Sequence, residues 1–217
     1  MLELLREKES LLKEVHHRVK NNLQVISSLV RLQLTQVENP IAQAALRDIQ
    51  NRIGSMALLH ETLYQSGNFT RVDLTTYLRT LCSQLCHSLV VDPRSIQLHL
   101  DVASVGLDVN QAVPCGLLIN ELVSNCLKHA FPNGRAGEVR VEVQLVDGGP
   151  ALRLRVADNG VGLPADFDQR QLPSLGLQLV SDLVGQLQGR LEIRRGPGAV
   201  FEVVFTPQTA NPLGGAS

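Results

Sequence analysis

The stretch that decides the fold is NELVSNCLKHAFP, residues 120–132. It ends a helical pattern that runs from Asn110 to Ala130 and stops at Phe131-Pro132, because proline cannot continue a helix. Glu121, Asn125 and Lys128 are spaced i, i+4 and i+7, so they share one face of this helix. An acid, a neutral oxygen ligand and a cation suit a magnesium–phosphate cluster, since Mg²⁺ prefers oxygen ligands and keeps several waters. An ordinary solvent-facing polar stripe has the same spacing.

A second candidate motif lies downstream, after two alternating runs that predict strands at Val139–Val146 and Leu152–Val156. Asp158-Asn-Gly160-Val-Gly162 follows the second strand directly. Glycines two residues apart let backbone approach a flat ligand, and an aspartate at a strand end can accept a hydrogen bond from an exocyclic amine. Many β-turns have this composition, so the motif alone is a weak indication.

The third candidate is a helix start at Ser174-Leu175-Gly176-Leu177. Gly176 falls in the first turn of a helix that reaches about Leu187, where backbone amides could cradle phosphates. A plain helix start fits equally well. Two last runs, Arg190–Arg195 and Ala199–Thr206, predict a β-hairpin.

Upstream of the central helix, Asp73 is placed to cap a helix that ends near Leu89, and Ile96–Val102 alternates like a strand. Three helices with four or five mostly antiparallel strands predict a two-layer α/β sandwich. The whole chain is therefore expected to be α+β, with this sandwich at residues 72–207 and a loose tail at 208–217.

The N-terminal part has a different period. Residues 2–37 contain no Gly or Pro, and Leu5, Leu12, Val19 and Ile26 recur every seven residues. Asn39-Pro40 breaks this helix, and a second helical pattern runs from Ile41 to about Gln65. A single helical hairpin leaves an apolar face uncovered, so residues 1–66 are expected to form a homodimeric four-helix bundle.

The first helix carries Glu14-Val-His16-His17-Arg18. If these four apolar residues, which recur every seven positions, occupy position a, His17 falls at the exposed position f and His16 at e. A largely unprotonated imidazole on the outside of a rigid helix is nucleophilic and accessible to another macromolecule. The alternative is a solvated helix face that happens to hold two histidines.

Composition excludes several classes of function. The chain has 217 residues, 44% hydrophobic and 19% charged, with a formal net charge of −1. A neutral chain without a basic stripe is not built to bind nucleic acid, and no apolar run reaches the roughly 20 residues that span a bilayer. Four cysteines do not form a disulfide framework at this length, which favours the cytoplasm. Cys82 and Cys86 lack the further ligands of a structural zinc site.

The order of these motifs resembles the sensor histidine kinases of two-component systems, and the resemblance covers nearly the whole chain. His-Arg-Val-Lys-Asn-Asn-Leu at 17–23 and the 120–132 stretch are similar to the HisKA_2 subgroup, which is close to the HWE kinases. The HWE pattern requires a later Trp that this chain lacks. The resemblance implies that residues 1–66 form the dimerisation and phosphotransfer domain. It also implies that residues 72–207 form a Bergerat-type ATP-binding domain.

The same resemblance assigns roles to the candidate residues. His17 would be the phosphorylated histidine, Asn125 the ligand of Mg²⁺, and Asp158 the partner of the adenine amine. Lys128 and His129 would lie near the phosphates, Gly160 and Gly162 would make room for the ring, and the 174–177 helix start would lie below the ATP lid. The usual acid after the phosphoacceptor is replaced by Arg18, so the base that takes the proton from His17 must be another group, with Glu14 and Glu121 as candidates.

The expected activity is autophosphorylation from ATP with Mg²⁺, followed by transfer to an aspartate of a response regulator receiver domain. The expected partners are a second copy of the chain, that regulator, and an N-terminal sensor domain outside this sequence. The rival functions are a non-catalytic dimeric adaptor for regulators and a gyrase-like ATPase that uses Glu121.

Overall fold

The computed structural model describes residues 2–66, 71–89, 95–146, 149–164, 167 and 175–208, without the side chains of 2–10, 12, 13, 16 and 64–66. Residues 67–70, 90–94 and 147–148, the candidate site residue Ser174 and the tail after Gln208 lie outside these residues. The chain divides into two compact units, Met1–Val72 and Asp73–Ser217, which are considered separately. In the part of the chain described, no helix is long and apolar enough to cross a membrane.

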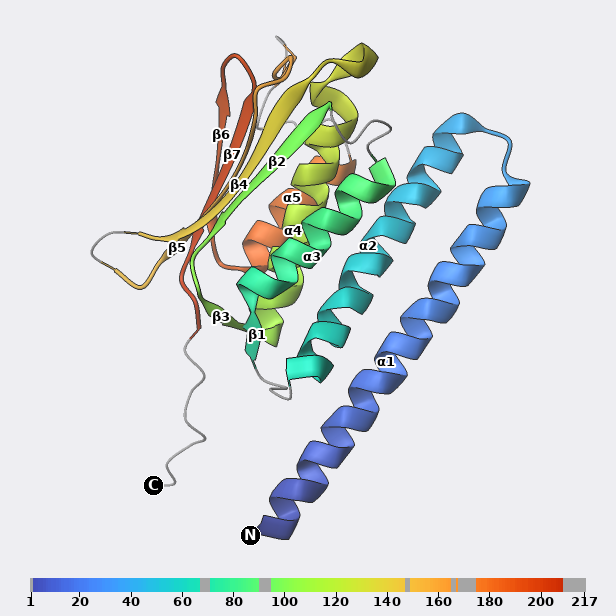
Figure 1. Cartoon of the computed structure of the whole chain (residues 1–217), viewed down its shortest axis with the longest axis vertical. Helices are drawn as coiled ribbons and strands as arrows, with labels where there is room; N and C mark the ends of the chain where they lie inside the picture. The colour runs from blue at the N-terminus through green and yellow to red at the C-terminus, as the bar shows by residue number, and fades with distance from the viewer. Residues whose placement is uncertain are drawn as a thin grey trace. The chain divides into compact units, whose positions relative to one another are not determined.

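The first unit is a hairpin of two long helices, α1 (Leu2–Gln36) and α2 (Pro40–Ser66), as the heptad pattern predicted (Figure 1). The side chain of Asn39 begins α2, because its Oδ1 accepts hydrogen bonds from the amides of Ile41 at 2.9 Å and Ala42 at 3.2 Å. Pro40 occupies the first turn, where its missing N–H costs nothing. An ion pair of 2.9 Å between Lys20 Nζ and Glu61 Oε1 joins the two helices.

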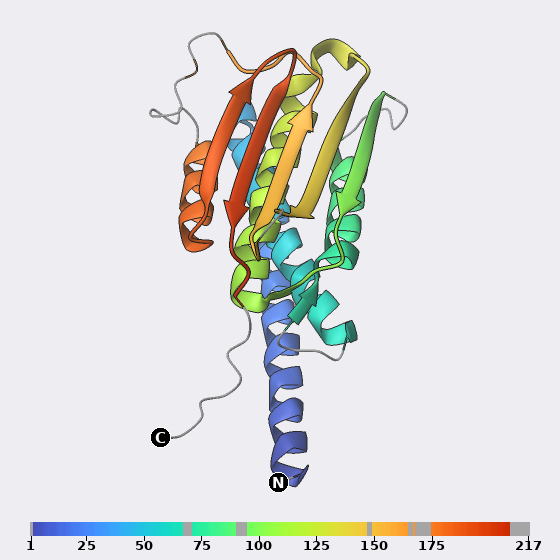
Figure 2. The same cartoon turned by 90° about the vertical axis from the view of Figure 1, so that its left-hand side faces the viewer.

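The second unit is a two-layer sandwich, in which three helices cover one face of a five-stranded sheet (Figure 2). The sheet order is β2-β4-β5-β7-β6; β2 pairs with β4 in parallel and the other neighbours are antiparallel. The strands are β2 (Ile96–Val102), β4 (Gly137–Leu145), β5 (Leu152–Asp158), β6 (Arg190–Arg195) and β7 (Ala199–Phe205). The helices are α3 (Leu74–Leu89), α4 (Val109–Asn125) and α5 (Leu175–Gln186). The mostly antiparallel α+β arrangement is confirmed.

Alternation along the strands builds the core. Every second residue along the middle of the central strands is buried, including Val141, Leu154 and Val203, while most residues between them are partly buried or exposed. Each such aliphatic side chain contributes about 1.5–3 kcal/mol by leaving water. On the other face, Arg155 pairs with Glu142 across β4 and β5 at 2.7 Å. The helices therefore cover the apolar face and the charged face stays solvated.

α4 is the central helix, and most of its surface is buried. Asp108 caps its first turn by accepting from the amide of Asn110 at 2.8 Å. Asp73 likewise caps α3, accepting from the Thr75 amide at 3.0 Å, as expected from the sequence. Two three-residue strands, β1 (Arg71–Asp73) and β3 (Gly106–Asp108), pair with each other and were not predicted.

The predicted helix 110–130 is not uniform. The α-helix ends at Asn125, and residues Cys126–Ala130 form a π-helical segment, followed by a 3₁₀ turn at Pro132–Gly134. β5 also runs two residues further than predicted, because Asp158 still pairs with Val139 of β4. Both differences fall at the candidate site.

Candidate functional site

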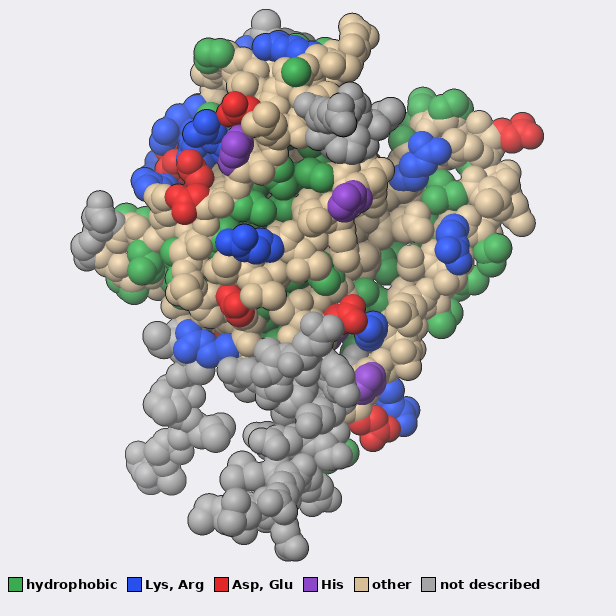
Figure 3. Space-filling model, in the orientation of Figure 1, with side chains coloured by type: hydrophobic (Ala, Val, Ile, Leu, Met, Phe, Trp, Pro, Cys, Tyr) green, Lys and Arg blue, Asp and Glu red, His purple; other side chains and the backbone are tan. Residues whose placement is uncertain are grey.

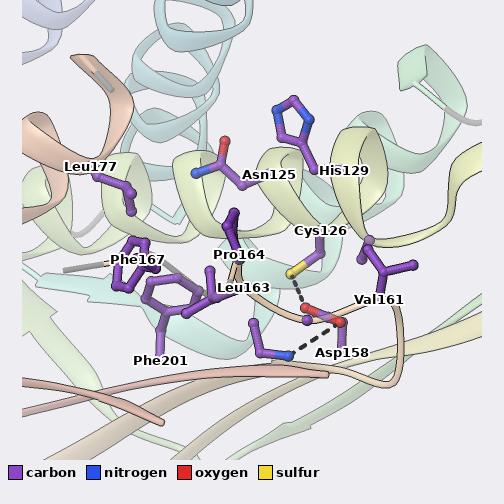
Figure 4. Close-up of a pocket in the computed structure, with 13 residues that line it drawn as sticks. Asn125, Cys126, His129, Asp158, Val161, Leu163, Pro164, Phe167, Leu177 and Phe201 are labelled. Atoms are coloured by element: carbon purple, nitrogen blue, oxygen red, sulfur yellow. Dashed lines mark hydrogen bonds between the residues drawn. The ribbon is translucent and has the colours of Figure 1, made fainter. Parts of the chain in front are cut away.

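A cavity of about 400 Å³ opens in the second unit (Figure 4). Its walls come from the junction of α4 with the π-helical segment, the loop after β5, the start of α5, and β7. The lining residues are Asn125, Cys126, His129, Ala130, Asp158, Val161, Gly162, Leu163, Pro164, Phe167, Leu177, Ala199 and Phe201. A mostly apolar wall with a few polar groups is typical of a pocket for a flat organic ligand.

Asp158 is the acid of this cavity, and both of its carboxylate oxygens are engaged. Oδ1 accepts hydrogen bonds from the amide of Gly160 at 2.8 Å and from the amide of Ala199 at 3.3 Å. Oδ2 accepts from the thiol of Cys126, with 3.6 Å between Sγ and Oδ2. The carboxylate is therefore held in one orientation from both sides.

The loop after Asp158 is fixed by backbone contacts. Asn159 continues the pairing of β5 with β4: its amide donates to the carbonyl of Glu138 at 3.2 Å, and its Oδ1 accepts from the Glu138 amide at 2.7 Å. The Val161 amide donates to the carbonyl of Ala130 at 2.9 Å.

The two glycines of the motif have different roles. A Cβ on Gly160 would collide with the backbone of Ala130, so this glycine allows the loop to pack on the π-helical segment. It does not line the cavity, in contrast to the expected role of making room for a ring. Gly162 does line it, and its φ of +74° is in the region that favours glycine.

The polar face predicted on the central helix is only partly directed into the cavity. Asn125 lines it, whereas Glu121 is 6% exposed, buried within α4, and Lys128 is exposed outside the lining residues. Of the two residues expected near the phosphates, Lys128 and His129, His129 is the one that lines the cavity. The reason is the π-helical segment, which has more residues in each turn than an α-helix. The larger turn places His129, rather than Lys128, on the same side of the helix as Asn125.

At the start of α5, Leu177 lines the cavity, while Leu175 is exposed and neither it nor Gly176 is a lining residue. Ser174 lies outside the described residues.

Sequence reasoning missed most of the apolar residues that line the cavity. Phe201 looks like any inward residue of an alternating strand, and Leu163, Pro164 and Cys126 carry no polar signature. Only their adjacency to the predicted motifs could have suggested them.

In the first unit, His17 lies on α1 with an exposed side chain, as the heptad position predicted. Glu14, one turn earlier, accepts hydrogen bonds from Nε and Nη2 of Arg18 at 3.0 and 2.7 Å. The side chain of His16 is outside the described residues.

Metal ligands are sparse in both units. Among the described residues, no three His, Cys, Asp or Glu side chains gather to hold a metal ion. The four cysteines form no disulfide bond. Within the cavity lining, the amide oxygen of Asn125 and the carboxylate of Asp158 are side-chain oxygens of the kind that contact hard cations.

Comparison with known families identifies both units. Residues 14–89 match the histidine kinase family HisKA_2, and residues 110–210 match the family of histidine kinase-, DNA gyrase B- and HSP90-like ATPases.

The individual proteins that this chain resembles are histidine kinases as well. The sensor histidine kinase PdtaS of Mycobacterium tuberculosis is 34% identical over 205 residues, covering 90% of this chain and 40% of PdtaS. Blue-light-activated histidine kinase 2 of Erythrobacter litoralis is 32% identical over 190 residues, covering 85% of this chain and 53% of that protein. The chain thus spans about two fifths to one half of the length of these relatives. The solved histidine kinase domain of E. litoralis EL346 superposes with a TM-score of 0.69 at 30% identity, covering 93% of both chains.

Proposed function

The chain belongs to the HisKA_2 histidine kinases, and from this premise we propose that it phosphorylates His17 from ATP and passes the phosphoryl group to an aspartate of a response regulator. The observation that carries the proposal is the pairing, in one chain, of an exposed histidine on a helical hairpin with a cavity in the ATPase-type unit where Asp158 and Asn125 face the same space. We assign residues 1–66 to dimerisation and phosphotransfer, and 72–207 to ATP binding.

Asp158 would accept the exocyclic amine of adenine, and the apolar wall of Leu163, Phe167 and Phe201 would exclude water from the ring. His129, on the same wall as Asn125, would lie toward the phosphates. The amide oxygen of Asn125 would hold Mg²⁺, which neutralises charge on the phosphates when it is bound.

A nitrogen of the neutral His17 ring would attack the γ-phosphorus; the P–N bond forms as the bond to the ADP oxygen breaks, and the ring proton leaves to a base. Glu14 is favoured over Glu121 as this base. It lies three residues before His17 on the same face of α1, whereas Glu121 is buried in α4 and does not line the cavity. Arg18 must release Glu14 for this role.

A homodimer is supported by the surface of the hairpin. α1 keeps several large apolar side chains exposed, among them Ile26 and Leu29 at 46% and 57%. Figure 3 shows such side chains at the surface along the hairpin. A second hairpin would cover them and complete a four-helix bundle. The four free cysteines support a reducing, cytoplasmic setting.

Incubation with γ-labelled ATP and Mg²⁺ tests the proposal. Label that is lost in acid and retained in base is expected in the wild type, since phosphohistidine has these stabilities. His17→Gln should abolish labelling and leave ATP affinity nearly unchanged, and His16→Gln, the matched control, should still be labelled. Released phosphate without label would favour a gyrase-like ATPase, and neither product would favour the adaptor. Loss of labelling in His16→Gln alone would move the site by one residue.

A further inference from the structure

Cys126 occupies the floor of the cavity, where the chemistry above gives it no task. Its thiol points at the Asp158 carboxylate (Figure 4), and the two residues come from different elements 32 positions apart in the chain. We propose that Cys126 is a specificity-determining residue: its thiol, as a neutral donor, orients Asp158 to accept one amine hydrogen, and so favours a 6-aminopurine over a 6-oxopurine. This inference rests on the proposed nucleotide site.

The argument begins with the capacity of the carboxylate. Each oxygen of an ionised Asp has about two acceptor positions. On Oδ1 both are occupied, by the amides of Gly160 and Ala199. On Oδ2 one is occupied by the Cys126 thiol. Among the contacts between described residues, one acceptor position of Asp158 remains, which matches a single N–H of an exocyclic amine. The carbonyl oxygen of a 6-oxopurine would instead meet the charged oxygen without a proton between them.

The contact itself is that of a donor and an acceptor. The distance of 3.6 Å between Sγ of Cys126 and Oδ2 of Asp158 is that of a thiol hydrogen bond to a carboxylate oxygen, so the thiol donates to Oδ2 and holds it in place.

The backbone around Cys126 fixes the position of its sulfur relative to Asp158. Cys126 is the first residue of the π-helical segment, and its own amide is shared between the carbonyls of Leu122 and Val123. Its backbone is therefore anchored to α4, while Asp158 is anchored at the end of β5 by its pairing with Val139. Two rigid elements set the 3.6 Å contact, so the orientation of the carboxylate is fixed before any ligand arrives.

The test compares the affinity of the full chain for ATP and for inosine triphosphate, which replaces the 6-amine with a carbonyl. Cys126→Ala removes the donor, and Cys126→Ser restores a donor of nearly the same size. Cys115→Ala is the matched control, because Cys115 is a buried thiol on the same helix that does not line the cavity.

We expect Cys126→Ala to lower the ATP-to-inosine triphosphate affinity ratio by about threefold to tenfold, the effect of one ordinary hydrogen bond, since a thiol is a weak donor. Cys126→Ser should restore the ratio and Cys115→Ala should leave it unchanged. In an Asp158→Asn background, Cys126→Ala should have no further effect on the ratio, because the acceptor that it orients has changed.

The contrary outcomes are distinct. An unchanged ratio in Cys126→Ala, or an equal loss in Cys126→Ala and Cys126→Ser, would overturn the inference and leave the nucleotide site intact. A wild type that binds both nucleotides equally would overturn the inference together with the role of Asp158. A wild type that binds neither would overturn the proposed function itself.

Discussion

At the scale of single residues, Asp158 connects the most parts of the site. Two backbone amides and a thiol orient its carboxylate, and these donors come from the loop after β5, from β7 and from the π-helical segment. A side chain held by three separate parts of the fold is preorganised for a ligand.

Asp158→Asn keeps the shape of the side chain but removes the charged acceptor. A charge-assisted hydrogen bond is worth about 1.5–3 kcal/mol, so we expect ATP affinity, measured by calorimetry, to fall roughly tenfold or more. Asp101→Asn makes the same change on β2, where the carboxylate accepts from Gln144 Nε2 at 2.9 Å, and should bind ATP normally. A wild type that prefers GTP or does not distinguish it from ATP would contradict this role of Asp158.

The buried thiol of Cys115 leads to a second prediction, which concerns the pH dependence of stability. Burial raises the pKa of Cys115 to about 12 from 9.0, so the folded chain holds this proton where the unfolded chain releases it. The contribution to stability is complete below pH 9 and is lost as the pH rises toward 12. Between these limits, one such thiol should change the unfolding equilibrium about tenfold per pH unit.

Urea unfolding at several pH values above 9 measures this effect. The stability of the wild type should fall more steeply with pH than that of Cys115→Ala, and the difference in slope should correspond to one proton. Parallel slopes would mean that Cys115 ionises as easily in the folded chain as in the unfolded one.

At the scale of elements, the hydrophobic periods predicted nearly every helix and long strand, because each such element buries one face over many residues. β1 and β3 were missed, since three residues are too few to show a period. The π-helical segment at Cys126–Ala130 was missed for a similar reason: a change of pitch over five residues hardly alters an average pattern. That change decides whether Lys128 or His129 lines the cavity.

The site was predictable where its residues belong to recognisable motifs. Asp158, Asn125, His129, Gly162 and Leu177 are such residues, and all five line the cavity. Phe201 and Cys126 reach the same space from a core strand and a helix interior, where their residue types are ordinary. Their role depends on non-local packing, which a single sequence does not specify.

Asn125, at the junction of α4 with the π-helical segment, leads to a prediction about the dependence of phosphorylation on Mg²⁺. In Asn125→Ala the only side-chain oxygen of α4 that lines the cavity is missing, whereas Asp158 and the apolar wall are unchanged. ADP binding without Mg²⁺ should survive, and autophosphorylation with Mg²⁺ should drop by orders of magnitude. Asn110→Ala, at the exposed start of the same helix, is the control and should retain activity. Near wild-type labelling of Asn125→Ala would mean that α4 does not hold the metal.

At the scale of the whole molecule, the two units differ in how they satisfy their apolar surface. The α/β unit closes its own core between the sheet and three helices. The hairpin has only two helices, and α1 keeps large apolar side chains exposed, among them Ile26 and Leu29. Those exposed apolar side chains are available for assembly with a second hairpin.

This division predicts how the chain assembles. Ile26→Glu combined with Leu29→Glu places two carboxylates on the apolar face of α1, where a second copy would have to bury them at a cost of several kcal/mol. We expect the wild type to be a dimer by light scattering and the double variant to be a monomer. Both residues are exposed within one chain, so the double variant should keep its helical content and its ATP affinity. Thr35→Glu adds one carboxylate on the polar side of α1, where Thr35 is exposed, and should stay dimeric. A dimeric double variant, or a monomeric wild type, would show that this face of α1 is not the dimer interface, and the four-helix bundle would have to be abandoned.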